Sequence, residues 1–299
     1  MVLPRVSIII VNWNGLEDTI ECLESFKKIS YPNYEVIVVD NGSEGDDARI
    51  LREKFGDYIR LIQNDKNYGF AKGCNVGVED ALARGAEYIL LVNNDTVIAP
   101  DSIDELIKVA QSDKNIGIVG GKIYFYEDPQ VIWFAGGSIN FWAGRTPLRG
   151  QGQIDCQDFG KVVAVDWIVG CFMLISRDVL LKVGLLDERF FFGWEDVDIC
   201  IRAARNGFRI LFAPEAKLWH KALASGKGER LAGIPLYYAA RNHFILMEKH
   251  WPKLQFVTSI LYYLLTFPKT ATNYSRLLHQ RSASKYMLWG IWDYLRRKW

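Results

Sequence analysis

Apolar runs and helical repeats alternate along the first 121 residues of the chain. Runs of β-branched and other apolar residues predict strands at 6–11, 35–39, 58–63, 88–92 and 116–121. Apolar residues spaced three or four positions apart predict helices at 16–28, 46–55, 73–83 and 100–111. This alternation is typical of a mostly parallel sheet with helices on its faces.

The pattern changes in the second half. Residues 124–161 are rich in glycine and aromatic residues without a steady period, so we expect loops and short antiparallel strands there. The apolar stretch 162–176 predicts one long strand, interrupted by Gly170. Further elements are expected as helices at 177–183 and 195–206 and a strand at 209–219, broken at Pro214. The fold class is therefore α/β, with a mixed, mostly parallel sheet, helices on both faces and a helical C-terminal segment.

Polar residues stand at four strand ends or strand–helix junctions, at 12–14, 40–43, 67–75 and 93–95. Each group alone is explained as an ordinary turn, because Asn, Asp, Gly and Ser favour turns. In an open α/β sheet, however, ligands bind outside the carboxyl ends of the strands. The four groups together therefore indicate a nucleotide site. In it Asp40 would meet the base or ribose, and Asp95, after a buried run, would meet a hard cation such as Mg²⁺ or Mn²⁺.

The sequence lacks the glycine-rich loops that bind phosphate without a metal. It has no P-loop motif, and the glycines around Gly69 and Gly73 fail the dinucleotide-binding spacing. These absences argue against a P-loop or hydride-transfer enzyme. We therefore expect a metal to neutralise a bound diphosphate.

A second acidic cluster, Glu195, Asp196 and Asp198, begins a predicted helix after an aromatic loop. Acids in the first turn of a helix often only complement its dipole. The preceding aromatic residues, which end in Trp194, favour a binding site, because Trp suits the apolar face of a sugar ring. A neighbouring carboxylate can act as general base on a hydroxyl. His220 ends the last strand, where it is either structural or a metal ligand.

Charge is unevenly distributed over the 299 residues, whose formal net charge is +1. From Lys269 onward seven Lys or Arg face one acid, Asp293, which gives 7 − 1 = +6 and leaves 1 − 6 = −5 for the preceding body. An acidic body with a basic tail indicates a tail directed to a surface and argues against nucleic-acid binding.

Five scattered cysteines without a Cys-x-x-Cys pair favour a reducing compartment over a zinc site or disulfide framework. The N-terminus runs directly into a strand, so we expect no signal peptide. The late apolar run 254–267 is shorter than the roughly 20 residues that a membrane-spanning helix needs. These features predict a cytoplasmic protein.

Taken together, the motifs resemble glycosyltransferase family 2, whose members have the GT-A fold. The resemblance covers residues 4–253, and its order and spacing are specific although each motif alone is weak. It rests on 6–14, 38–43, 67–71 with Asn75, 91–95, 193–198 and His220. The branch resembled is rhamnosyltransferase-like, in which Asn-Asn-Asp replaces the more general Asp-x-Asp. Asn93 thus stands where the general pattern has an acid.

The resemblance implies an inverting, metal-dependent transfer of a sugar, rhamnose or another hexose, from a UDP- or dTDP-sugar to a hydroxyl of a glycan or lipid-linked glycan. It implies Asp196 as the catalytic base, and Asp95 with His220 as ligands of Mg²⁺ or Mn²⁺. The implied sugar or acceptor residues are Trp194, Glu195 and Gly170. The implied nucleotide-binding residues are Asn12, Asp40, Asn67, Gly69, Lys72, Asn75 and Asn94.

The implied GT-A domain is 1–250, with a nucleotide-binding half at 1–121 and an acceptor half at 122–250. The remaining helical segment, 251–299, combines aromatic and basic residues. Three interpretations of this segment stay open: helices packed on the core, a dimer interface, or an element that associates with a membrane. The third would place the enzyme at the inner face of the cell membrane.

Two other functions stay open. A sugar nucleotidyltransferase shares a similar sheet, but residues 12–16 do not offer its glycine-rich basic loop. A non-catalytic sugar-nucleotide or glycan-binding module is the second alternative, and the presence of both Asp95 and Asp196 argues against it.

Overall fold

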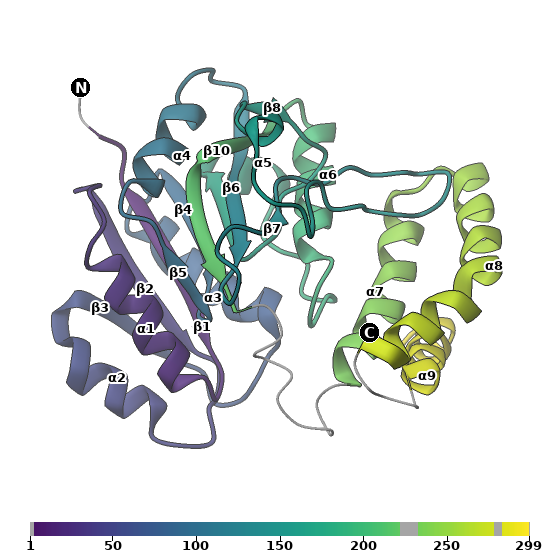
Figure 1. The fold of residues 1–299 in the computed structure, drawn as a ribbon. Helices are drawn as coiled ribbons and strands as arrows, with labels where there is room; N and C mark the ends of the chain where they lie inside the picture. Colours follow the sequence, from purple (N-terminus) through teal and green to yellow (C-terminus); the bar gives the residue numbers. More distant parts are fainter. Residues whose placement is uncertain (1–2, 222–232, 278–282, 299) are drawn as a thin grey trace.

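The computed structural model describes residues 3–221, 233–277 and 283–298. Within these residues the chain builds one large sheet and a separate layer of C-terminal helices (Figure 1). The strands are β1 (Val6–Asn12), β2 (Tyr34–Asp40), β3 (Ile59–Gln63), β4 (Tyr88–Asn93), β5 (Thr96–Ile98), β6 (Ile116–Phe125), β7 (Ile132–Phe134), β8 (Val163–Ala164), β9 (Phe172–Ser176) and β10 (Arg209–His220). The helices are α1 (Leu16–Phe26), α2 (Asp47–Phe55), α3 (Phe70–Ala83), α4 (Ser102–Ala110), α5 (Arg177–Val183), α6 (Glu195–Arg205), α7 (Ile234–His250), α8 (Lys253–Leu277) and α9 (Ala283–Leu295).

The first half of the sheet is parallel, in the order β3-β2-β1-β4. Its central strand β1 is apolar on both faces, and Ile8 and Ile9 are fully buried. A continuous apolar strand of this kind needs cover on both sides. Helix α3 covers one face at very short range, because a Cβ on Gly77 would lie 2.7 Å from Ile9 Cγ2. The parallel arrangement brings the carboxyl ends of these strands to one edge.

The second half of the chain continues the same sheet. β9 lies antiparallel between β4 and β6, and β10 follows beside β6 as a parallel neighbour. The remaining antiparallel pairings involve the short strands β5, β7 and β8. The predicted α/β class with a mixed sheet is therefore confirmed, and the residues of the acceptor half are built into the sheet that carries the nucleotide half.

Several predicted boundaries are wrong. Residues 162–176 do not form one strand, because β8 pairs with β10 whereas β9 pairs with β4. Between them the backbone bonds elsewhere, with Trp167 bridged to Gly137 and Gly170 bound to a side chain. β10 is not broken at Pro214, since the strand continues through a register shift. The helix predicted from residue 73 begins at Phe70.

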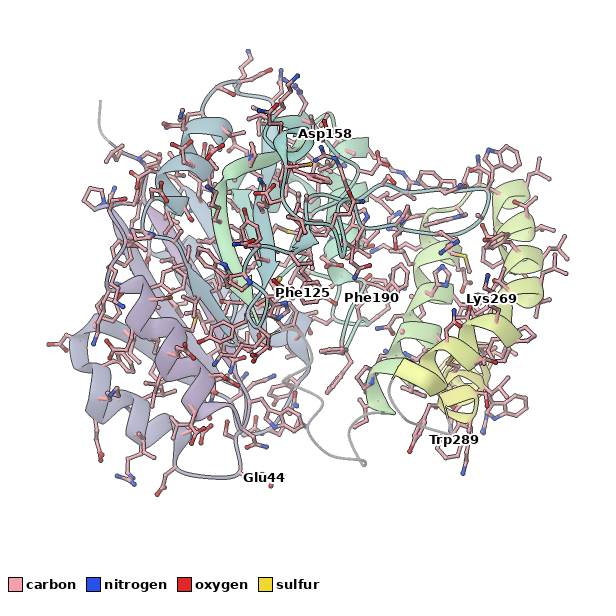
Figure 2. The ribbon with its side chains drawn as sticks, viewed as in Figure 1. Glu44, Phe125, Asp158, Phe190, Lys269 and Trp289 are labelled. Atoms are coloured by element: carbon pink, nitrogen blue, oxygen red, sulfur yellow. The ribbon has the colours of Figure 1, made fainter. Side chains whose placement is uncertain are left out.

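Three C-terminal helices form the layer on the far side of the molecule from α1 and α2 (Figure 1). α7 was not predicted, and it shares a small apolar cluster with the other two helices, formed by Leu236, Ala240, Ala271 and Met287. α8 also holds the 141–145 loop, where Ser259 Oγ donates to the carbonyl of Phe141 at 2.9 Å. Figure 2 places Lys269 and Trp289 on this layer. The predicted helical C-terminal segment is confirmed, although its residues 278–282 and 299 lie outside those described.

None of the helices in the described ranges is both long enough and apolar enough to span a bilayer.

Candidate functional site

The edge formed by the carboxyl ends of β1 and β2 holds a buried polar pair. Asn12 and Asp40 lie opposite each other in the strand register, and Asn12 Nδ2 donates to Asp40 Oδ1 at 2.8 Å. Ser43 Oγ donates to the same carboxylate oxygen at 2.6 Å. Both paired side chains are almost completely buried. Because these bonds hold Asp40 in one orientation, it forms a fixed acceptor group at the sheet edge.

Asn94 joins this pair through Thr19 of α1. The Thr19 hydroxyl donates to Asn12 Oδ1 at 2.8 Å, and Asn94 Nδ2 donates to the Thr19 hydroxyl oxygen at 2.9 Å. Three residues expected at one site, Asn12, Asp40 and Asn94, are therefore connected by hydrogen bonds. Thr19 was not identified from the sequence, since a threonine on a helix face gives no signal of its own.

The 67–75 segment is divided between two surroundings. Asn67 Oδ1 accepts from the backbone N–H of Gly69 at 2.8 Å and so shapes the turn before α3. Gly69 has φ +87°, and a Cβ there would lie 2.5 Å from the carbonyl oxygen of Phe191. Lys72 pairs with Glu188 at 3.1 Å, and the Asn75 amide bonds to the backbone of Leu186. Asn67 and Gly69 therefore shape the turn, whereas the partners of Lys72 and Asn75 lie at 186–188.

Asp95 and His220 meet at the end of β10. His220 Nε2 lies 3.1 Å from Asp95 Oδ1, and both side chains are buried. The backbone supports the pair, because the N–H of Lys221 donates to the carbonyl of Asp95 at 3.0 Å. Burial alone would raise the pKa of Asp95, but the hydrogen bond and charge of His220 outweigh it and leave the pKa lowered. The lowered pKa favours the ionised carboxylate.

The donor atoms at this pair fit a divalent metal ion. Asp95 offers carboxylate oxygens and His220 an imidazole nitrogen, while Asn93 Oδ1 nearby in the chain is buried without a hydrogen-bond partner. Among the described residues, however, no group of three or more His, Cys, Asp or Glu side chains is arranged to hold a metal. A metal at this pair would therefore take its other ligands from a diphosphate and water.

Asp196 begins α6 and is anchored by two backbone donors. Its Oδ2 accepts from the N–H of Gly170 at 3.0 Å, and its Oδ1 accepts from the N–H of Val197 at 2.8 Å. Burial raises the pKa of Asp196 to about 6, although these hydrogen bonds oppose the rise. Such a pKa is suited to a general base near neutral pH.

Glu195 is the buried neighbour of Asp196. Burial and the charge of Asp196 raise the pKa of Glu195 well above its ordinary value, and Glu195 Oε2 is buried without a hydrogen-bond partner. The raised pKa favours the protonated form of Glu195, whose carboxyl group can donate a hydrogen bond.

The aromatic loop before these acids is held in a strained conformation. Trp194 has φ 79°, in the left-handed region that non-glycine residues rarely adopt, directly after Gly193 with φ 77°. The Trp194 indole stacks on His243 of α7 at a ring-centroid distance of 4.7 Å. Strain of this kind persists only where surrounding contacts enforce it. α7 supplies those contacts.

Two polar residues of α7, Arg241 and Asn242, clamp the loop. Asn242 is fully buried, and its Nδ2 donates to the carbonyls of Phe192 and Gly193, each at 3.0 Å. Arg241 donates to the carbonyl of Arg189 at 2.8 Å and to Asn242 Oδ1 at 2.9 Å. Both were missed from the sequence. The signal that could have found them is an Arg-Asn pair inside an otherwise apolar helical repeat.

The chain segments that carry the Asp95–His220 pair and the two acids are connected through Gly170 and Cys171, which directly precede β9. The N–H of Asn93 donates to the carbonyl of Cys171 at 3.4 Å, and the preceding residue, Gly170, binds Asp196. A Cβ on Gly170 would lie 3.6 Å from the Asp196 Cβ and 3.8 Å from Glu195 Oε1. Gly170 therefore lies against both acids, and the two chemical groups are fixed to adjacent residues of one segment.

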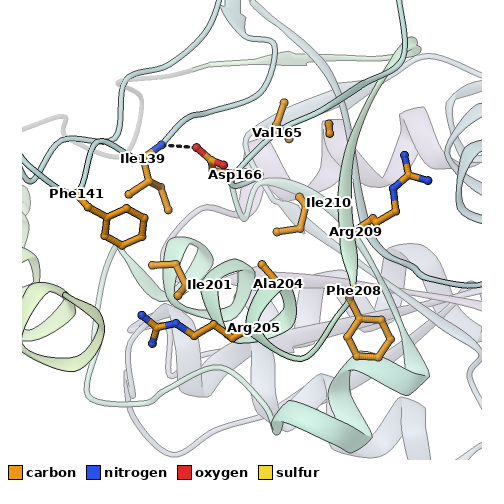
Figure 3. Close-up of a pocket in the computed structure, with 11 residues that line it drawn as sticks. Ile139, Phe141, Val165, Asp166, Ile201, Ala204, Arg205, Phe208, Arg209 and Ile210 are labelled. Carbon is orange, nitrogen blue, oxygen red and sulfur yellow. Dashed lines mark hydrogen bonds between the residues drawn. The ribbon is translucent and has the colours of Figure 1, made fainter. Parts of the chain in front are cut away.

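A separate pocket lies beside the C-terminal half of α6, where Ile201, Ala204 and Arg205 line it (Figure 3). It has a volume of about 260 Å³ and is bounded by the 139–141 loop, the β8–β10 edge and α6. Its walls are mostly apolar, with Ile201 and Ile210 among them and Asp166 bound to the backbone of Ile139. None of the site residues expected from the sequence lines this pocket.

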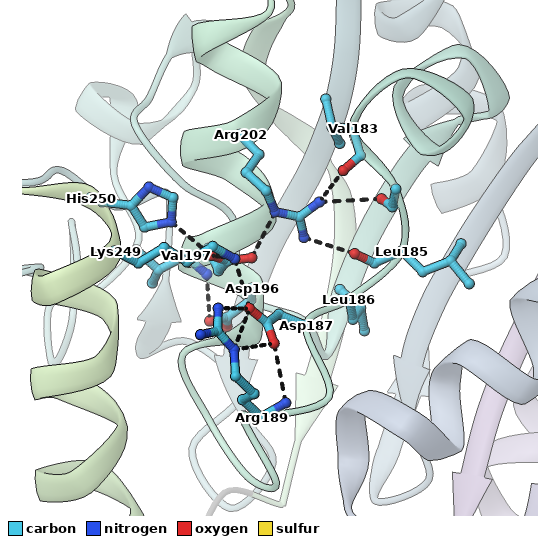
Figure 4. A network of polar contacts seen from close by, with 12 residues as sticks. Val183, Leu185, Leu186, Asp187, Arg189, Asp196, Val197, Arg202, Lys249 and His250 are labelled. Atoms are coloured by element: carbon cyan, nitrogen blue, oxygen red, sulfur yellow. Dashed lines mark hydrogen bonds and ion pairs between the residues drawn. The ribbon is translucent and has the colours of Figure 1, made fainter. Parts of the chain in front are cut away.

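Asp198, the third acid of the sequence cluster, belongs to a buried ionic network (Figure 4). It is fully buried, and its carboxylate binds Arg202 Nε at 2.7 Å, His250 Nε2 at 2.7 Å and Lys249 Nζ at 2.6 Å. Arg202 in turn donates to the carbonyls of Val183 and Leu185. Asp198 therefore fixes α6 to α7, whereas Asp196, two residues earlier, is bound by backbone N–H groups.

Comparison with known proteins agrees with this arrangement. Residues 4–232 match the family model for glycosyltransferase like family 2. The dTDP-rhamnosyl transferase RfbF of Shigella flexneri is 24% identical over 87% of this chain and 86% of its own length. The rhamnosyltransferase WbbL of Escherichia coli is 27% identical over 73% of this chain and 83% of its own. An uncharacterized protein of Sinorhizobium fredii is 32% identical over 74% of this chain, which spans only 25% of that protein.

Solved structures share the fold at low sequence identity. The mannosyltransferase PcManGT from Pyrobaculum calidifontis, in complex with GDP-Man and Mn²⁺, has a TM-score of 0.61 at 16% identity and covers 100% of this chain and 89% of its own. GalNAc-T7 with UDP, GalNAc and Mn²⁺ has a TM-score of 0.62 at 16% identity, over 88% of this chain and 58% of its own. These likenesses establish the GT-A fold. With a family model that spans most of its length, the chain belongs to glycosyltransferase family 2, in the rhamnosyltransferase-like branch.

Proposed function

We propose that this glycosyltransferase catalyses an inverting, metal-dependent transfer of a hexose, rhamnose included, from a UDP- or dTDP-sugar to a hydroxyl group. The observation that carries the proposal is the connection of two groups through residues 170–171. Cys171 accepts from the backbone N–H of Asn93, two residues before Asp95 with its partner His220, and Gly170 donates to Asp196, a buried carboxylate of raised pKa.

The nucleotide is proposed to bind along the carboxyl ends of β1 and β2. Asp40, oriented by Asn12, accepts a hydrogen bond from the base or ribose. Trp13 follows directly in the chain, and 41% of its side chain is exposed, so its ring is free to cover the base. The diphosphate then extends toward Asp95 and His220. A divalent cation, Mg²⁺ or Mn²⁺, would supply positive charge for the leaving diphosphate there.

Asp196 is proposed to act as the general base. Its carboxylate removes the proton of the acceptor hydroxyl while that oxygen attacks the anomeric carbon from the face opposite the diphosphate. The new glycosidic bond forms as the bond to the diphosphate oxygen breaks, and the nucleoside diphosphate leaves with the bonding electrons. The anomeric configuration is thereby inverted. The neutral Glu195 is placed to donate a hydrogen bond to the sugar or acceptor, beside Gly170.

The acceptor is proposed to be a glycan or lipid-linked glycan of polysaccharide or cell-envelope biosynthesis, glycosylated from the cytoplasmic side. The names of several relatives support this class. They include the low-salt glycan biosynthesis hexosyltransferase Agl10 of Haloferax volcanii and a poly-beta-1,6-N-acetyl-D-glucosamine synthase of Staphylococcus epidermidis. This chain spans 64% and 61% of those two proteins.

A donor screen tests the proposal. The protein is incubated with UDP-, dTDP- and GDP-sugars and a water-soluble glycan acceptor, each with Mg²⁺, with Mn²⁺ or with a chelator, and release of nucleoside diphosphate is measured. We expect release from a UDP- or dTDP-hexose that the chelator abolishes, and NMR of the product should give the inverted anomer. Binding of a donor without release from any of them would favour the non-catalytic binding module. Chelator-resistant release would contradict the metal requirement.

A further inference from the structure

The outer faces of α8 and α9 carry exposed apolar side chains at helical spacing. On α8 these are Leu254, Val257, Leu261, Leu264 and Leu265, each at least 52% exposed. On α9 they are Leu288, Trp289, Trp292 and Leu295, each at least 49% exposed. The inner faces of both helices are already used, since they share the buried cluster with α7. We call this set of nine residues the C-terminal apolar face. Contiguous exposed apolar surface of this kind marks an interaction site.

Basic residues accompany the C-terminal apolar face. Lys285 Nζ lies 4.6 Å from the centroid of the Trp289 ring, and the Arg296 guanidinium lies 5.8 Å from that of Trp292. Lys298 follows at the end of α9 and is exposed. Trp beside Lys or Arg is typical of the boundary between lipid headgroups and acyl chains. The chain from Lys269 onward carries a net charge of 7 − 1 = +6.

Helix α9, which carries one part of the C-terminal apolar face, lies at the same end of the molecule as the nucleotide edge, whereas α8 runs down toward α9 from the opposite end (Figure 1). Glu44 follows the carboxyl end of β2, and Figure 2 shows Glu44 and Trp289 both at the lower end of the view. In the same orientation Figure 1 shows the carboxyl ends of β1 and β2 and helix α9 at that end. A flat surface that contacts α9 from below would therefore also face the open side of the strand edge.

We propose that the C-terminal apolar face docks on a bilayer of anionic lipids. The apolar side chains enter the headgroup boundary, the basic residues contact lipid phosphates, and α8 and α9 lie along the surface. This places the strand edge opposite the bilayer, where a lipid-linked acceptor would present its hydroxyl. That consequence for the acceptor rests on the proposed function, whereas docking itself does not.

Charge distinguishes a bilayer from a second copy of the chain. A symmetric dimer would place the same patch of each copy against the other. The basic residues described beside the face, Lys285, Arg296 and Lys298, would then meet their own copies, which is unfavourable for like charges close together. An anionic lipid surface complements the same charge. The observations therefore favour lipid as the occupant.

Co-sedimentation of the full chain with lipid vesicles tests the proposal, without any sugar nucleotide. Vesicles of phosphatidylcholine alone are compared with vesicles that also contain phosphatidylglycerol. We expect stronger partitioning onto the anionic vesicles, weakened at about 1 M salt, where the Debye length is about 3 Å. Leu264→Gln with Leu265→Gln should reduce partitioning by roughly ten-fold or more. Arg296→Gln with Lys298→Gln should reduce it about five-fold per charge removed, on the anionic vesicles.

Matched variants on other surfaces serve as controls. Leu181 of α5 is 64% exposed, so Leu181→Gln removes a comparable exposed leucine elsewhere. Arg52→Gln with Lys54→Gln on α2 removes two exposed charges away from α8 and α9. Partitioning of the controls should equal that of the unchanged protein. Equal losses in control and test variants, or no sedimentation with anionic vesicles, would overturn the proposal.

Two further measurements separate the remaining outcomes. Light scattering should give the same mass for the unchanged protein and the Leu264 and Leu265 variant; a dimer that this variant dissociates would assign the face to a second copy and overturn the proposal. Nucleoside diphosphate release with a water-soluble acceptor is measured in parallel. If neither the unchanged protein nor any variant releases nucleoside diphosphate, the proposed function is refuted. Vesicle binding would still test the docking surface independently.

Discussion

The backbone N–H of Gly170 donates to Oδ2 of Asp196 at 3.0 Å. The second oxygen of Asp196 accepts from the N–H of Val197 at 2.8 Å. These bonds orient a buried carboxylate, and the first of them comes from the segment whose next residue, Cys171, binds the backbone N–H of Asn93. The relationship makes Asp196, and not Asp198, the member of the acidic cluster that is positioned for chemistry.

Asp196→Asn should therefore lower the rate of sugar transfer by about 10²- to 10⁴-fold, which is the typical contribution of a general base. The amide oxygen of Asn can still accept the N–H of Gly170, so we expect the fold and the donor affinity to stay nearly unchanged. Nucleoside diphosphate release measures the first effect and calorimetry with the donor measures the second. An Asp196→Asn enzyme with substantial activity would refute the assignment.

The pH dependence of activity should report the same carboxyl group. Burial raises the pKa of Asp196 to about 6, so the protonated form, which cannot accept a proton, dominates below that pH. We expect kcat/KM to be flat above pH 7 and to fall as pH decreases through about 6, by about ten-fold per unit once well below it. Donor binding, followed by calorimetry across the same range, separates loss of the base from loss of the nucleotide. A profile that stays flat down to pH 5 would be inconsistent with Asp196 as the base.

Most strands of the sheet could be predicted because each is marked in the sequence by a continuous apolar run. β1, β2 and β4 are apolar on both faces, and their polar ends are distinct, so the sequence predicts both the strands and the edge where Asn12 and Asp40 meet. The predicted strand at 162–176 failed for a related reason. Apolar character persists through Trp167 and Ile168, but Trp167 bridges to Gly137 and Ile168 packs against Gly120 of β6, so neither belongs to a continuous strand.

Some residues of the candidate site could likewise be predicted from the sequence, and others could not. Asp95, His220 and Asp196 follow from their places at strand ends or at the start of a helix. Asn242 was missed, because it binds two loop carbonyls through tertiary contact and the sequence marks it only as part of an Arg-Asn pair inside an apolar helical repeat. Lys72 and Asn75 do carry a signal in the sequence, but the structure shows contacts outside the expected nucleotide edge. Their place in a motif is clear, yet their described partners lie at 186–188.

The Asp95–His220 pair predicts how nucleotide binding depends on metal. Asp95→Ala removes the carboxylate, and we expect binding of a nucleoside diphosphate to lose its dependence on Mn²⁺ or Mg²⁺. His220→Ala should weaken the same dependence less, because the carboxylate oxygens remain. Calorimetry with and without metal measures both. Glu17→Gln, an exposed acid on α1, is the control and should behave as the unchanged protein. Metal-dependent binding that survives Asp95→Ala would remove Asp95 from the metal site.

Asn242→Ala tests whether α7 positions the catalytic loop. The change leaves the carbonyls of Phe192 and Gly193 without their donor, and Arg241 Nε without its acceptor. We expect a loss of about 1–3 kcal/mol in the free energy of unfolding, measured by denaturant titration. A positioning role further predicts that kcat falls while KM for the donor changes little, at a temperature well below the unfolding midpoint.

Asn206→Ala is the matched control for this variant. Asn206 Nδ2 also donates to a backbone carbonyl, that of Arg202 at 2.9 Å, but at the exposed end of α6. Its loss should have a small effect on stability and none on kcat, because it holds no part of the 189–194 loop. If Asn242→Ala lowers stability and leaves kcat unchanged, α7 supports the fold without orienting the loop. A selective fall in kcat means that the strained Trp194 backbone, and with it Asp196, depends on this helix for its position.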